Sequence, residues 1–183
     1  MNRSEMKRFV QRLSADEASH TLNLLLDENP DLMKRIYDCA AKVAATVDAD
    51  DIADDIFSRL DNLDYDDLNG RAGRTQHGYV SPDQAAWDLF EEALTPFINE
   101  MAKNHKRALP AVAKTYCIGL VKGLQRYEKS SFSDLSDWLQ DAPDEYIDTV
   151  VDEWKKGNPS DEDAAEVLNI VKGGSYEGKR RRP

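Results

Sequence analysis

Apolar side chains recur every three or four positions along most of the chain. Leu32, Ile36, Ala40, Val43 and Val47 follow this spacing, which places apolar residues on one face of an α-helix. No stretch alternates apolar and polar residues with β-branched enrichment over more than three or four positions. The pattern therefore predicts an all-α protein.

Helix-capping residues predict where the helices begin. Side-chain oxygens of Ser, Asn and Asp accept hydrogen bonds from the free amides of a first helical turn, so we expect N-caps at Ser14, Asn29, Ser81, Ser133 and Ser160. Glycines are expected to end helices at Gly157 and Gly173, and Pro96 is expected to bend the longest one. The predicted helices span 4–13, 15–28, 30–47, 50–63, 82–105, 110–128, 134–140, 143–156 and 161–172.

Short connections between these helices predict antiparallel pairs. Such pairs form either a helical bundle or a short α-solenoid of the HEAT or TPR kind. We expect a single domain over 1–172, with a leading hairpin at about 1–47, a central part at about 48–129 and C-terminal helices at about 130–172. Residues 173–183 lack apolar periodicity and are predicted to form a flexible basic tail.

Charge and composition limit the kinds of partner that we expect the chain to bind. A formal net charge of −11 makes nucleic acid an unlikely ligand, since phosphate binding needs an excess of Lys and Arg. No apolar run approaches the roughly 20 residues of a membrane helix, so we expect no membrane contact. The chain begins without the apolar stretch of a signal peptide. Cys39 and Cys117 fall among apolar positions and are expected to be buried free thiols in the cytoplasm.

Charges of opposite sign are concentrated in two segments. Residues 48–67 hold nine aspartates and a single cation, Arg59, whereas residues 103–129 are rich in Lys and Arg. Such segments either steer a partner or attract each other within the fold, and we favour the second interpretation.

The run Asp50-Asp51-Ile-Ala-Asp54-Asp55 has the Asp-Asp-x-x-Asp spacing by which a helix presents carboxylates to Mg²⁺ bound to a diphosphate. A second acidic motif on a facing helix is required, and Glu91-Glu92 is the only nearby candidate. A solvated helix face explains the aspartates without a metal. We therefore expect no metal site, no cofactor and no catalytic residue.

The segment 64–80 is longer than a helix-to-helix turn requires, and long connections are often functional. It contains Arg71, Arg74, His77 and Tyr79 and leads into the helix that begins after Ser81. Two arginines beside a helix N-terminus favour a pocket for a phosphate or for a partner's carboxylate. Alternatively, the arginines pair with the neighbouring aspartates and only fix the loop.

Gly119 and Gly123 lie four residues apart on one edge of a predicted helix. Positions without a side chain at this spacing predict the close approach of a neighbouring helix of the same chain. The alternative is a groove for a helix of a partner.

Three segments resemble the uncharacterised helical-repeat segment that accompanies some SWIM-type zinc-finger proteins. They are 51–57 (DIADDIF), 78–94 (GYVSPDQAAWDLFEEAL) and 116–120 (YCIGL), and 24–32 (LLLDENPDL) is similar to the leading hairpin of that family. With two cysteines this chain does not contain the zinc finger itself. The resemblance implies a helical adaptor or scaffold and assigns no functional residue.

These observations lead us to predict a non-enzymatic protein-interaction module with a protein partner. We expect its contact surface near residues 64–80 and the two helices that follow them. The alternative is a Mg²⁺-dependent all-α hydrolase of nucleotide or diphosphate substrates that uses the aspartates of 50–55. A homodimer remains open, because a second copy could complete such a site.

Overall fold

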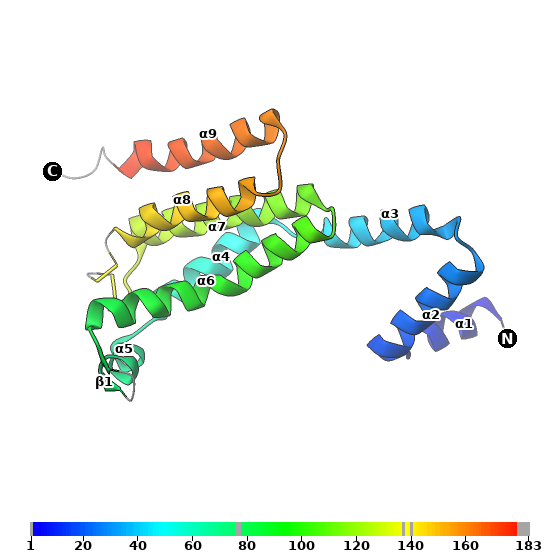
Figure 1. The fold of residues 1–183 in the computed structure, drawn as a ribbon, viewed down its shortest axis with the longest axis horizontal. Coiled ribbons are helices and arrows are strands. Elements are labelled where there is room, and N and C mark those ends of the chain that lie inside the picture. The colour runs from blue at the N-terminus through cyan, green and yellow to red at the C-terminus, as the bar shows by residue number, and fades with distance from the viewer. Residues whose placement is uncertain (1, 76–77, 137, 140, 179–183) are drawn as a thin grey trace. The chain divides into compact units, whose positions relative to one another are not determined.

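The protein is all-α, as a computed structural model of residues 2–75, 78–136, 138–139 and 141–178 shows (Figure 1). The described residues form nine helices and one small antiparallel sheet. In chain order the elements are α1 (Arg3–Val10), α2 (Ala15–Glu28), α3 (Leu32–Ala44), α4 (Ala49–Asp61), α5 (Tyr65–Arg71), β1 (Gly73–Thr75), β2 (Gly78–Val80), α6 (Pro82–Lys106), α7 (Pro110–Ser130), α8 (Ala142–Lys155) and α9 (Asp161–Gly178).

Contacts along the chain divide it into two compact units. Unit 1 is Met1–Ala44 and unit 2 is Ala45–Pro183. The boundary falls near the end of the predicted leading segment, at about residue 47. That the segments form a single domain over 1–172 stays a prediction. Among the described residues, no helix has the length and apolar character that a membrane span requires.

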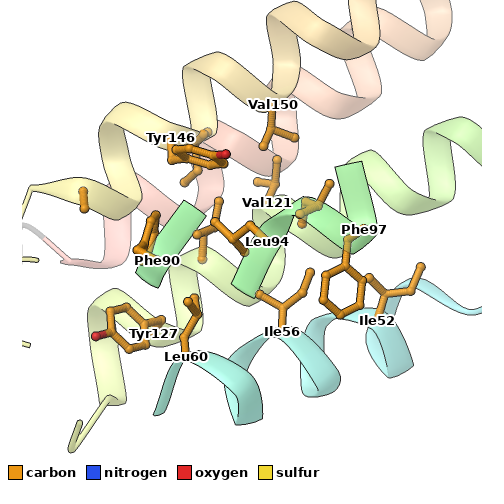
Figure 2. Packing of buried hydrophobic residues seen from close by; sticks show 14 of the residues in the cluster. Ile52, Ile56, Leu60, Phe90, Leu94, Phe97, Val121, Tyr127, Tyr146 and Val150 are labelled. Atoms are coloured by element: carbon orange, nitrogen blue, oxygen red, sulfur yellow. The ribbon is translucent and has the colours of Figure 1, made fainter. Parts of the chain in front are cut away.

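Unit 2 is a helical bundle with α7 at its centre. α7 packs against α4, α6, α8 and α9, so it contacts the apolar faces of helices that are far apart in sequence. Figure 2 shows side chains from four of these helices meeting in one cluster. Phe90 lies edge-on to Tyr146, with ring centroids 5.5 Å apart, and 6.2 Å from Tyr127. These aromatic contacts join α6 to both α7 and α8.

The two glycines of α7 allow α4 to approach closely. A Cβ atom at Gly119 would lie 2.6 Å from Cγ2 of Ile52, and one at Gly123 would lie 2.8 Å from Cβ of Ile56. The predicted close approach of a neighbouring helix is therefore confirmed, and that helix is α4.

Ion pairs and hydrogen bonds hold α9 against α7. Lys114 Nζ lies 2.6 Å from Asp163 Oδ1 and 2.8 Å from Glu166 Oε2. Farther along, Gln125 Nε2 donates to the backbone carbonyl of Ile170 at 3.2 Å. The two carboxylates raise the pKa of Lys114, so the ammonium group stays charged where it is partly shielded from water.

Several predicted boundaries are wrong. The predicted helix 134–140 is absent from the described residues of that segment, which form turns: the Ser133 hydroxyl accepts from Leu135 N, two residues on. Gly173 does not end α9, which continues to Gly178, so only 179–183 of the predicted tail lie outside the described residues. After α8 the left-handed backbone falls on Asn158, with φ of 52°, rather than on Gly157.

Unit 1 departs from the predicted hairpin. Ser14 and Glu17 form the expected capping box at the start of α2, but Asn29 ends α2 instead of capping α3. In Figure 1, α2 and α3 diverge from the turn that joins them instead of lying side by side. Cys39 of α3 is exposed, contrary to our expectation, whereas Cys117 in unit 2 is buried.

Candidate functional site

Residues 64–75 and 78–80 of the predicted long connection are folded into a helix and a small sheet, which the sequence analysis did not predict. Asp64 caps α5. Its Oδ1 accepts from Asp66 N at 2.9 Å and from Asp67 N at 3.0 Å, and the Asp64 amide donates to Oδ2 of Asp67. α5 packs against α6, and an ion pair joins Arg71 to Glu92. Local capping and one charge pair thus fix α5 on the first half of α6.

A two-stranded hairpin follows α5. Gly73 and Gly78 adopt φ of 108° and 131°, a conformation that favours glycine. Gly73 pairs with Val80 and Gly78 with Thr75, and between these two pairs the register places Arg74 opposite Tyr79. Residues that face each other across an antiparallel pair extend to the same side of the sheet, so this cation and this aromatic ring share one face.

The connection between α7 and α8 reaches the same end of the bundle. Asp61 Oδ1 accepts from the Ser131 hydroxyl and from the Phe132 amide, both at 2.8 Å. The Ser133 hydroxyl donates to the Leu63 carbonyl at 2.9 Å. These bonds hold the residues after α7 beside the start of α5, and Figure 1 shows this connection, α5 and β1 at one end of unit 2.

Four exposed aromatic side chains belong to these segments. Tyr65 begins α5 and is 48% exposed, and Tyr79 of β2 is 74% exposed. Phe132 and Trp138, in the connection between α7 and α8, are 91% and 40% exposed. We call this set of four residues the aromatic end. Exposed aromatic side chains on segments that meet at one end of a folded domain are typical of binding sites.

The predicted site residues are only partly brought together. Arg74 and Tyr79 are exposed cross-strand neighbours, and Tyr79 belongs to the aromatic end. Arg71 forms an ion pair with Glu92 of α6, not with the aspartates that precede it in sequence. His77 lies outside the described residues. No anion pocket can therefore be assigned to the four residues as a set.

Sequence reasoning missed Tyr65, Phe132 and Trp138. The first was placed in a linker, and Trp138 was assigned to a helix that the described residues of 134–140 do not form. One signal was present: Phe132 stands alone among polar residues in Ser130-Ser131-Phe132-Ser133, where no helical face would bury it. Its exposure follows from that position.

The acidic run of α4 is divided between two environments. Asp50 Oδ1 lies 2.9 Å from Lys122 Nζ, and Asp54 forms an ion pair with Arg126. The hydrogen bond from Lys122 lowers the pKa of Asp50, so this carboxylate stays ionised. The predicted attraction between the acidic and basic segments is confirmed at these two pairs, and it neutralises two carboxylates that a metal would need.

Asp51 and Asp55 line a pocket of about 300 Å³ instead. Apolar atoms of Ile52 and Phe97 also line it, and Arg59 places its guanidinium 5.1 Å from the Phe97 ring centroid. In the described ranges, no three His, Cys, Asp or Glu side chains come together as a metal-binding group. Arg59, stacked on the ring of Phe97, therefore places a positive charge in the same pocket as Asp51 and Asp55.

No protein-family model, curated protein or solved structure matches this chain. The resemblance to the segment that accompanies SWIM-type zinc-finger proteins stays an expectation from the sequence.

Proposed function

We propose that the chain is a non-enzymatic protein-interaction module whose unit 2 binds a protein partner through the aromatic end. The observation that carries the proposal is the exposure of Tyr65, Tyr79, Phe132 and Trp138 on segments held together at one end of the bundle. Tyr, Trp and Phe are enriched at the centres of protein interfaces, because they bury a large area at a small cost in conformational entropy.

The charges at this end suit a protein partner. Arg74 shares a face with Tyr79, and Arg is also enriched at interfaces because its planar group binds carboxylates in pairs of hydrogen bonds. The hydrogen bond from the Phe132 amide to Asp61 restrains the backbone at this residue, which lowers the entropy that binding would otherwise cost. A mixed-charge surface with an apolar centre fits these groups, because Asp66 and Asp67 lie in the first turn of α5 beside Tyr65.

The test uses two variants of the full chain. Proteins that co-purify with the wild type from its native cells are identified, produced separately and titrated against each form. Phe132→Ser and Tyr79→Ser should each weaken the affinity at least tenfold, about 1.4 kcal/mol.

The matched control is Leu168→Ser. Leu168 is an exposed apolar residue of α9, a helix that contributes no residue to the aromatic end, and its replacement should leave the affinity unchanged. The proposal is wrong if both aromatic variants bind every identified partner as tightly as the wild type does.

A further inference from the structure

Unit 1 consists of three helices whose apolar side chains remain exposed. None of its described residues, 2–44, is buried. Nine large apolar side chains are exposed there: Met6, Phe9, Val10, Leu22, Leu24, Leu25, Met33, Tyr37 and Val43. Met6, Phe9 and Val10 fall on one face of α1, and Met33 and Tyr37 on one face of α3. The unit is amphipathic but has no core of its own.

Such a unit needs a covering surface. Helices of 8, 14 and 13 residues are marginal in water when isolated, and packing of their apolar faces supplies most of their stability. A chain of about 40 residues rarely folds alone without disulfides, a metal or association. The divergence of α2 from α3 leaves the faces of both helices available (Figure 1).

The charges of α2 and α3 oppose their own helix dipoles. Asp27 and Glu28 occupy the last turn of α2, where the partial charge is negative and where the helix has no cation. Lys34 and Arg35 occupy the first turn of α3, where the partial charge is positive and no acid is present. Among the described residues, none of the four forms an ion pair. Neither the acidic pair nor the basic pair therefore has an ion-pair partner, and the two pairs carry opposite charges.

We propose that unit 1 binds unit 1 of a second copy of this chain, with the end of α2 of one copy beside the start of α3 of the other. In a dimer with a two-fold axis this contact occurs twice, because both copies use the same surface patch. Asp27 and Glu28 of each copy then meet Lys34 and Arg35 of its partner. The proposal concerns unit 1 and does not rest on the function proposed for unit 2.

The distribution of net charge favours this mode of association. Acidic and basic residues are equal in number in residues 1–44, so the whole formal charge of −11 lies in residues 45–183. Two copies of unit 2 repel each other, whereas two copies of unit 1 do not. Apolar area is available for this contact, because nine large apolar side chains of unit 1 are exposed, and removing such area from water is the main driving force of association.

The first experiment measures the mass of the full chain by light scattering over a range of concentrations. The proposal predicts a particle of twice 20.7 kDa that dissociates on dilution. A mass of one chain at every concentration would overturn it, and would mean that unit 2 or a different protein covers these faces.

Two charge-reversal variants give the sharper test. One variant carries Asp27→Lys and Glu28→Lys, and the other carries Lys34→Glu and Arg35→Glu. Each variant places like charges together in the proposed dimer. Both changes suit the dipole of their own helix, so loss of association cannot come from a weakened helix. Each variant alone should be monomeric, and an equimolar mixture of the two should form a heterodimer.

The control reverses the same amount of charge in unit 2, by Asp144→Lys with Asp148→Lys on the exposed face of α8. This variant should dimerise at least as well as the wild type. The proposal fails if either charge-reversal variant of unit 1 remains dimeric. It also fails if both are monomeric and their mixture does not associate.

Discussion

Gly123 of α7 lies so close to Ile56 of α4 that a Cβ atom on the glycine would stand 2.8 Å from Cβ of the isoleucine. The same added atom would be 3.1 Å from the carbonyl oxygen of Ala53, one turn earlier on α4. Side chain and backbone both restrict the space, so the separation of the two helices depends on the absence of a methyl group. Because α7 also contacts α6, α8 and α9, a shift between α4 and α7 would disturb the whole bundle.

We predict that Gly119→Ala and Gly123→Ala each lower the free energy of unfolding by about 1–3 kcal/mol, because the added methyl overpacks the contact with α4. This loss exceeds the gain of up to about 1 kcal/mol that alanine gives a helix over glycine. Urea unfolding followed by circular dichroism measures the difference.

The matched control is Gly173→Ala in α9, where an added Cβ atom meets nothing within 4 Å. Here only helix propensity acts, and the variant should be as stable as the wild type or more stable. Equal behaviour of all three variants would show that α4 and α7 are not closely packed.

Much of the fold could be predicted from spacing and caps. The bounds of α2 were predicted without error, because Ser14 and Glu17 form a reciprocal capping box. α5 was missed although Asp64 and Asp67 have the same spacing, since seven residues give little apolar periodicity. The false helix at 134–140 has the opposite cause. Ser133 resembles an N-cap, but its hydroxyl donates to the Leu63 carbonyl and accepts from Leu135 N, and the described residues of the segment form turns.

The candidate site was less predictable, because tertiary contacts assemble it. Arg74 and Tyr79 are close in sequence and were selected together. Phe132 belongs to the connection held beside the start of α5 because Asp61, far away in the chain, accepts its amide hydrogen bond. Arg71 was selected for its charge, yet its partner is Glu92, which no local pattern identifies.

Buried groups that titrate in the alkaline range predict a loss of stability at high pH. Burial raises the pKa of the Cys117 thiol from 9.0 to about 12. The unfolded chain therefore releases this proton first, so the contribution to stability is complete below pH 9 and is lost as the pH rises toward 12. We expect a loss on the order of 1 kcal/mol by pH 10 from this group alone.

The comparison that isolates this effect is Cys117→Ala, measured by urea unfolding at pH 7 and pH 10. Burial also raises the pKa of Tyr127 and of Tyr146, so some alkaline loss should remain in the variant. The decline between the two pH values should nevertheless be smaller than in the wild type. An identical decline would mean that the thiol ionises as easily in the folded chain as in the unfolded one.

We predict that millimolar Mg²⁺ does not shift the thermal unfolding midpoint beyond the effect of matched ionic strength. Lys122 and Arg126 pair with Asp50 and Asp54, and among the described residues no three His, Cys, Asp or Glu side chains come together as the group of ligands that the ion requires. A site filled at 100 times its dissociation constant would add about 2.7 kcal/mol, a shift of several degrees. Such a shift, absent in Asp51→Asn, would favour the alternative hydrolase function.

The separation of the chain into two units predicts that residues 45–183 fold without residues 1–44. Every residue of the buried core lies between Ile52 and Val167, so removal of unit 1 takes no side chain from it. We expect the fragment 45–183 to unfold cooperatively in urea, with a free energy of unfolding within about 1 kcal/mol of the full chain measured at concentrations where that chain is monomeric. Its mass should be that of one chain at every concentration, because the proposed dimer contact has been removed. A loss of several kcal/mol would instead show that unit 1 packs on unit 2 and contributes to its stability.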